Sequence, residues 1–205
     1  LGDVYKRQTY NFQTVPNQPA ITIVPGPPKI WVAVIPSTIT CGETFSLKIK
    51  AEDMWGNPTN QAVKTLIPKT NKPIKNLPEF INIKEGNFAT VVSGLMVNSA
   101  GALEIKLYSP DGSLVATCNP SKVFNSSILK NYWGDLHGQS EETLGTNSAA
   151  DYFAFGRDYA FLDACAHQGN DFQMTDTFWK DLNKITAQFN EEGKFVTLPG
   201  YEWSG

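Results

Sequence analysis

Only two histidines occur in this chain of 205 residues, and each has an acidic residue close to it in the sequence. Asp135 precedes His137 by two residues in NYWGDLHGQS, and His167 is followed by Asp171 in AHQGND. A third candidate, Glu202, lies between two aromatic residues near the end of the chain, where an unpartnered carboxylate would be costly to bury. Imidazole and carboxylate together suit Zn, Mn or Fe, and such cations turn bound water into hydroxide near neutral pH. The residue types therefore predict a metal-dependent hydrolytic site.

Each of these side chains has an expected role. We expect His137, His167 and Glu202 to be metal ligands, and His167 and Asp171 to assist catalysis. Asp135 lies on the same side of a strand as His137, so it is expected to take part either as a ligand or by orienting the imidazole. The alternative for a histidine on a buried strand is a structural, hydrogen-bonded role. Divalent metal ions are the cofactors expected.

The elements that carry these residues alternate between strand and helix from residue 131 onward. Strands are predicted at GDLH, AFLDACA and KFVTLPGYEW, and Ser148 is placed as the N-cap of a first helix. A second helix is predicted in TDTFWKDLNKITAQFNEEG, where apolar residues are spaced by 4, 3 and 4 positions. Thr175 or Asp176 caps the start of this helix, and Gly193 is placed at its C-terminal cap.

This strand, helix, strand, helix, strand order predicts parallel pairing with right-handed crossovers. The carboxyl ends of parallel strands share one edge, where the active sites of α/β proteins form. The first strand ends at His137, the second at His167 and the third at Glu202. The hypothesis therefore depends on three strands delivering two imidazoles and a carboxylate to one cavity.

The first part of the chain has the pattern of an antiparallel β-sandwich, which we place at residues 28–122. Apolar and polar side chains alternate in ETFSLKIKAED, and further short strands are separated by Gly, Pro, Asn and Asp turns. Residues 1–27 combine an adapter-like octapeptide, LGDVYKRQ, with a Pro-rich linker, and residues 123–130 are expected to form a second linker. The stretch CGETFSLKIKAEDMWGNP resembles bacterial immunoglobulin-like modules, which usually serve as spacers or docking surfaces.

Residues 131–205 resemble the opening third of the polymerase and histidinol phosphatase (PHP) superfamily, through YWGDLHGQS, FLDACAHQGND and FVTLPGYEWSG. The resemblance is to an uncharacterised bacterial branch with a Gly-Asp-Leu-His motif. It implies a distorted, seven-stranded (β/α) barrel that binds two or three ions of Zn, Mn or Fe and hydrolyses phosphoesters. By this resemblance, His137 matches the first histidine of a His-x-His motif, and Glu202 matches the carboxylate that ends the third strand and bridges metals.

The chain departs from that family pattern in three ways. Gln139 replaces the second histidine of His-x-His, and a neutral amide is a poor ligand for these metals. The usual Asp-His after the second strand is replaced by HQGND, which leaves His167 and Asp171 in shifted positions. The sequence also stops before the family's later histidine and Asp-x-His ligands, so we expect a truncated fragment that is inactive by itself. The alternative is a non-catalytic glycan- or protein-binding protein with a degenerate barrel.

The composition limits the partners. Seventeen basic and twenty acidic residues give a net charge of −3, and no basic stripe marks a nucleic-acid surface. No apolar run approaches the roughly 20 residues that cross a bilayer. Cys41, Cys118 and Cys165 lack zinc-site spacing and are expected to be small apolar residues, although Cys41 and Cys118 could pair within the sandwich. A small-molecule substrate is the expected partner, and the compartment and the oligomeric state stay open.

Overall fold

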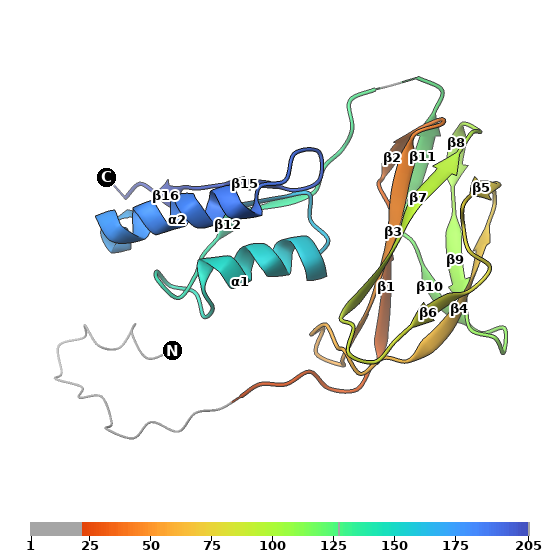
Figure 1. Cartoon of the computed structure of the whole chain (residues 1–205), viewed down its shortest axis with the longest axis horizontal. Helices are drawn as coiled ribbons and strands as arrows, with labels where there is room; N and C mark the ends of the chain where they lie inside the picture. Colours follow the sequence, from red (N-terminus) through yellow and green to blue (C-terminus); the bar gives the residue numbers. More distant parts are fainter. Residues whose placement is uncertain (1–21, 127, 205) are drawn as a thin grey trace. The chain divides into compact units, whose positions relative to one another are not determined.

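The computed structural model describes residues 22–126 and 128–204, which divide between two compact units (Figure 1). One unit comprises Pro25–Tyr132, and the other contains the chain from Trp133 onward. The adapter-like octapeptide and most of the predicted Pro-rich linker lie outside the described residues. Within the described ranges, no helix is long and apolar enough to span a membrane.

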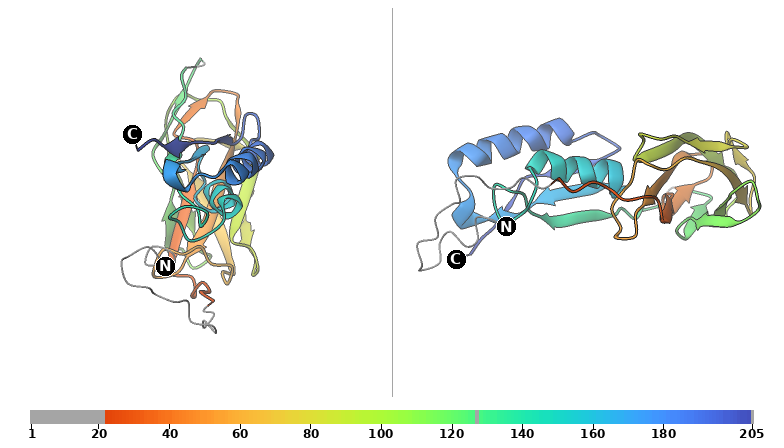
Figure 2. Two further views of the ribbon diagram at one scale, coloured as in Figure 1. Left: turned by 90° about the vertical axis from the view of Figure 1, so that its left-hand side faces the viewer. Right: turned by 90° about the horizontal axis from the view of Figure 1, so that it is seen from below.

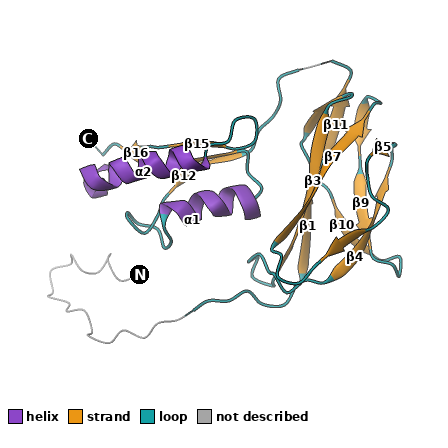
Figure 3. Ribbon diagram, viewed as in Figure 1, coloured by secondary structure: helices purple, strands orange, loops and turns teal. Residues whose placement is uncertain are grey.

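The first unit is a sandwich of short strands (Figure 3) that form three sheets. One sheet has the order β1 (Ile30–Val34), β3 (Thr44–Glu52), β7 (Ala89–Val97), β5 (Ile74–Lys75). A second has the order β10 (Leu114–Thr117), β9 (Ile105–Tyr108), β4 (Lys64–Thr70), β6 (Ile81–Ile83). A third has the order β2 (Thr38–Thr40), β11 (Ser121–Phe124), β8 (Gly101–Leu103). The pairing is antiparallel as predicted, except that β2 and β11 are parallel.

The alternating pattern of β3 explains how the sandwich forms its core. Phe45, Leu47, Ile49 and Ala51 are all buried, and they pack with buried apolar residues from the other strands. Full burial of a leucine or isoleucine side chain contributes about 1.5 to 3 kcal/mol. The sequence prediction of a half-buried strand at this place is therefore confirmed.

Two details of the sandwich differ from the sequence prediction. The pattern does not predict β4, because Pro68 lies inside it and proline cannot donate a ladder hydrogen bond. The structure accommodates Pro68 because β4 pairs with β6 only at residues 64–66 and with β9 only at residues 67–70. β11 pairs with β2 as far as Phe124, so the sandwich continues past the predicted boundary at residue 122 and into the predicted linker.

The cysteines are unpaired, so Cys41 and Cys118 do not form the disulfide that their shared unit would have allowed. Cys118 and Cys165 are buried, and Cys41 is partly buried. Burial raises the pKa of the Cys118 thiol to about 12 and also raises the pKa of Cys165. Because a protonated thiol is a poor nucleophile, these residues behave as small apolar side chains.

The second unit contains a parallel sheet in the order β12 (Gly134–Gly138), β13 (Ala164–His167), β15 (Val196–Leu198). Its helical connections are α1 (Ala149–Ala154), which continues into the π-helical η1 (Phe155–Tyr159), and α2 (Asp176–Phe189). Both α-helices lie on the same face of the sheet (Figure 2). The predicted order of strands and helices and their parallel pairing are confirmed, whereas closure into a barrel stays a prediction.

The helix ends follow the predicted caps at two of three places. Ser148 and Thr175 cap α1 and α2 with their hydroxyl oxygens, each of which accepts a backbone N–H three residues ahead at 3.1 Å. The end of α2 differs from the prediction, because Asn190 is its C-cap and Gly193 lies in the following turn with φ 74°. Asn190 Oδ1 accepts the Thr197 N–H at 3.2 Å, which ties the end of α2 to β15.

The two faces of the parallel sheet differ in exposure. Thr197 donates its hydroxyl to the Thr186 carbonyl of α2 at 2.7 Å, so its neighbours Val196 and Leu198 point away from the helices. These two side chains are 47% and 48% exposed, and Leu136 of β12 is exposed as well. Because parallel strands are normally covered on both faces, this apolar surface is where a further layer is expected.

Candidate functional site

The candidate site lies where the parallel strands end. Past β13 and β15 the chain forms a second parallel pair, β14 (Gly169–Asn170) and β16 (Tyr201–Glu202), in which Asn170 is opposite Glu202. His137 of β12 forms an ion-pair contact through its Nε2 with Glu202 Oε1. The two side chains are 72% and 33% exposed, so a solute can reach both. The structure thus brings together two of the three predicted metal ligands, from the first and the third strand.

Asp135 holds the backbone of His137, whereas the sequence led us to expect contact with the imidazole ring. Asp135 Oδ1 accepts the His137 N–H at 3.0 Å, where the register between β12 and β13 shifts. The Tyr152 hydroxyl fixes the same irregularity, because it lies 3.2 Å from the carbonyl oxygen of Asp135 and 3.1 Å from that of Ala166. Burial, above all other causes, raises the pKa of Tyr152, so this hydroxyl remains a donor. Asp135 therefore positions His137 through the main chain.

His167 is fully buried and lies apart from the contact between His137 and Glu202. Its Nδ1 accepts the Gly169 N–H at 3.3 Å, and its Nε2 is 2.8 Å from Ser140 Oγ. Because a backbone N–H can only donate, the neutral ring carries its hydrogen on Nε2 and donates it to Ser140. Burial lowers the pKa of His167, which favours this neutral form. The arrangement corresponds to the structural alternative for a buried histidine, since both ring nitrogens have partners inside the protein.

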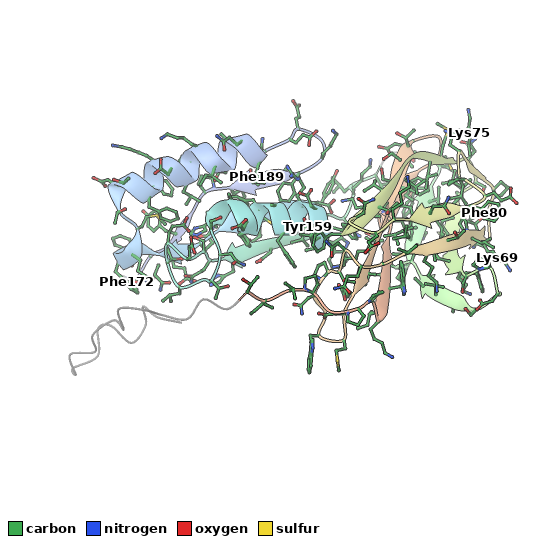
Figure 4. All side chains as sticks on the ribbon, turned by 60° about the horizontal axis from the view of Figure 1, so that its bottom comes forward. Lys69, Lys75, Phe80, Tyr159, Phe172 and Phe189 are labelled. Atoms are coloured by element: carbon green, nitrogen blue, oxygen red, sulfur yellow. The ribbon has the colours of Figure 1, made fainter. Side chains whose placement is uncertain are left out.

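Asp171 anchors the segment that follows Glu202. Its Oδ2 accepts the Ser204 N–H at 3.0 Å, and its Oδ1 accepts the Ser204 hydroxyl at 2.7 Å and the Phe172 N–H at 2.8 Å. These hydrogen bonds, the Ser204 backbone first, lower the pKa of Asp171. Phe172 extends from the same short helical turn, η2 (Asp171–Gln173), at the end of the unit (Figure 4). Asp171 thus holds the chain beside Glu202 and is a positioning residue in this geometry.

A pair of amides lies beside Glu202, and the sequence pattern identified only one of them. Gln139 Nε2 donates to Asn170 Oδ1 at 3.1 Å, and Gln139 Oε1 accepts the Leu144 N–H at 3.3 Å. Asn170 is the strand neighbour of Glu202, and paired residues of parallel strands project from the same side of the sheet. The position of Asn170 in HQGND, one residue before Asp171, was the signal available in the sequence.

The donors present fit one cation better than several. Across residues 22–126 and 128–204, no three His, Cys, Asp or Glu side chains gather closely enough to hold a metal ion. His137 and Glu202 supply one imidazole nitrogen and one carboxylate, which match the preferences of Zn, Mn and Fe. A complete site of this kind needs three or four ligands, and His137 and Glu202 supply two.

Comparison with known proteins finds relatives of unassigned role. No protein-family model matches the chain. An uncharacterized protein of Chlamydia pneumoniae is 29% identical over 174 residues, which cover 83% of this chain and 28% of that protein. An uncharacterized protein of Chlamydia trachomatis serovar D is 28% identical over 172 residues, which cover 82% of this chain and 28% of that protein. The chain therefore spans only 28% of the length of each of these relatives.

Similarity to solved structures is slight. The D00-D0 domain of intimin aligns with a TM-score of 0.36 and 10% identity, over 51% of this chain and 50% of that one. The C-terminal domain of ZirS aligns with a TM-score of 0.36 and 13% identity, over 60% of this chain and 90% of that one.

Proposed function

We propose that this chain is part of a metal-dependent hydrolase acting on phosphoesters, and that His137 and Glu202 hold its cation in part. The observation that carries the proposal is the contact between His137 Nε2 and Glu202 Oε1 at the carboxyl ends of the parallel strands. Active sites of parallel α/β folds form at this edge. The matched relatives are much longer than the segment they share with this chain. The remaining ligands are proposed to come from the rest of such a protein.

The exposed face of the parallel sheet supports the same proposal. Val196 and Leu198 of β15 point away from the helices and are about half exposed. In a (β/α) barrel this face lines the interior, which is filled by side chains of the other strands. The proposed PHP-type barrel thus explains both the position of the candidate ligands and the uncovered apolar surface.

The residues of this chain divide the proposed work among them. A divalent cation, when bound, supplies Lewis acidity and a water of lowered pKa. His137 and Glu202 would hold that cation, and Asp135 keeps His137 in place by accepting its backbone N–H. Asp171 fixes the segment after Glu202 through Ser204. The buried His167 holds the strand end through its hydrogen bonds with Ser140 and Gly169, and its full burial keeps the ring away from a bound substrate.

Calorimetric titration of this chain with Mn²⁺ tests the proposal. Wild type is expected to bind Mn²⁺, and His137→Ala and Glu202→Ala are each expected to weaken that affinity at least tenfold, because each removes a ligand. Glu192→Ala is the matched control, since it removes an exposed carboxylate from the turn after α2. Equal affinities in wild type and the two ligand variants would contradict the proposal. They would favour the non-catalytic binding protein as the alternative.

A further inference from the structure

The orientation of the amide pair beside Glu202 follows from one backbone group. The Leu144 N–H lies 3.3 Å from one end of the Gln139 amide, and a backbone N–H can only donate. That end of Gln139 must therefore be its oxygen, and its nitrogen must face Asn170 at 3.1 Å. The atom of Asn170 that meets this nitrogen must in turn be its oxygen. Both amides are thus oriented by a chain of hydrogen bonds that starts at the main chain.

In this orientation each amide oxygen already accepts one hydrogen bond, whereas an N–H group of Asn170 is left without an acceptor among the described residues. The Gln139 oxygen accepts from Leu144, and the Asn170 oxygen accepts from Gln139. Within the described part of the chain, the Asn170 Nδ2 group has no hydrogen-bond partner, and Asn170 is the register neighbour of Glu202. A cation is repelled by N–H groups, whereas an anionic oxygen accepts from them. The Asn170 Nδ2 group therefore favours an anion beside the proposed cation ligands.

We propose that Asn170 donates a hydrogen bond from Nδ2 to an anionic oxygen of the ligand, and that Gln139 is the residue that positions it. The inference rests on the proposed function, because it names a phosphoryl-type oxyanion as the group bound next to the cation of His137 and Glu202. It also gives a physical role to the glutamine at a position where a histidine was expected. In this proposal Asn170 binds the anion, Gln139 positions Asn170, and neither residue is a metal ligand.

Inorganic phosphate is the probe, and calorimetric titrations with and without Mn²⁺ measure its affinity for this chain. With Mn²⁺ present, Asn170→Ala is expected to bind phosphate about tenfold more weakly than wild type, as for the loss of one hydrogen bond to a charged group. Asn170→Asp, which keeps the shape but replaces donors with a negative charge, is expected to bind phosphate more weakly still and Mn²⁺ more tightly. Asn183→Ala is the matched control, because it removes an exposed amide of α2 that bonds to the Trp179 carbonyl.

The positioning role of Gln139 has its own readout. In a ¹⁵N-labelled protein, the Asn170 side-chain amide signals of wild type are expected to shift when phosphate is added. Gln139→Leu keeps Asn170 but frees its amide to rotate, so phosphate affinity is expected to fall severalfold, by less than in Asn170→Ala. Circular dichroism shows whether each variant is folded, and the conservative Asn170→Asp keeps the test decisive if Asn170→Ala unfolds.

The outcomes separate the inference from the proposed function. A wild-type chain that binds no Mn²⁺ contradicts the proposed function. Equal phosphate affinity of wild type and the Asn170 variants, with or without Mn²⁺, overturns the inference. A tenfold loss of Mn²⁺ affinity in Asn170→Ala also overturns it, because Asn170 would then be a metal ligand.

Discussion

Replacement of His167 by alanine separates a structural histidine from a metal ligand. The change removes the hydrogen bonds to Ser140 Oγ and from the Gly169 N–H, each of which contributes about 1 kcal/mol. The change also leaves a cavity in place of a fully buried ring that packs edge-on against Phe178, with ring centroids 5.5 Å apart. This cavity lowers the free energy of unfolding by about 2 kcal/mol more. We expect His167→Ala to lower the free energy of unfolding by about 3 to 4 kcal/mol, with Mn²⁺ affinity unchanged.

The pH dependence of stability gives this prediction a second signature. Burial lowers the pKa of His167 below the 6.5 of an unperturbed histidine, so the unfolded chain binds more protons than the folded one in mild acid. The stability associated with the neutral ring is complete above pH 6.5 and is lost as the pH falls below that value. The slope reaches at most about 1.4 kcal/mol per pH unit. His167→Ala should lack this pH-dependent stability. His137→Ala should retain it, because His137 is exposed and the change leaves His167 in place.

Urea unfolding, monitored by amide hydrogen exchange at residues 133–204, measures both the loss of stability and its pH dependence. Exchange at these residues reports on the second unit alone. Titrations between pH 7.5 and 5 compare wild type with each variant. The reasoning is refuted if His167→Ala is as stable as wild type, or if it loses Mn²⁺ binding as completely as His137→Ala.

Three further changes test other parts of the structure. Phe153→Ala, which empties a fully buried ring 5.8 Å from that of Phe189, is expected to cost about 3 to 5 kcal/mol in urea unfolding of the second unit; a loss below 1 kcal/mol would contradict the described core. Asp53 has a pKa lowered to about 2, chiefly by its hydrogen bond from the Asn57 side chain, so its contribution to the sandwich should be present above pH 3.8 and disappear as the pH falls through 2. Acid unfolding of Asp53→Asn should lack the loss of stability that comes from protonating Asp53. An acid unfolding profile equal to that of wild type would contradict this contribution of Asp53. Asp171→Ala should weaken Mn²⁺ binding severalfold by releasing the segment after Glu202, and calorimetry that shows no change would remove its positioning role.

Patterns of period two and of period 3.6 were sufficient for most of the fold. The alternation from Phe45 to Ala51 predicts β3, and the spacing of Phe178, Leu182, Ile185 and Phe189 predicts α2. Both patterns show which side chains a regular element buries, so the element can be predicted without knowing what it packs against. The start caps were predictable for the same reason, because a cap depends on residues a few positions apart.

The missed features depend on contacts between residues far apart in the sequence. Pro68 is tolerated in β4 only because the strand changes neighbours there, and Asn190 ends α2 by bonding to Thr197 of the following strand. No local pattern contains either partner. Such tertiary contacts override local propensity at element ends and edges.

The candidate site was predictable in its location and less so in its details. The strand order correctly brings His137 and Glu202 to one edge. The role of His167 was less predictable, because only the structure shows that Cys165, two positions earlier on the same strand, packs against the helices. His167 faces the same way and is buried against Phe178.

Titration of ¹⁵N-labelled chain with Zn²⁺, observed at the imidazole nitrogens, tests the central claim most directly. The chain has only two histidines, so each ring gives its own signals. Coordination is expected to shift the Nε2 signal of His137 at stoichiometric Zn²⁺ and to leave the signals of the buried His167 unchanged. The shift at His137 is expected to disappear in Glu202→Ala. Shifts at His167 in place of His137, or a His137 shift that persists in Glu202→Ala, would contradict a cation held jointly by His137 and Glu202.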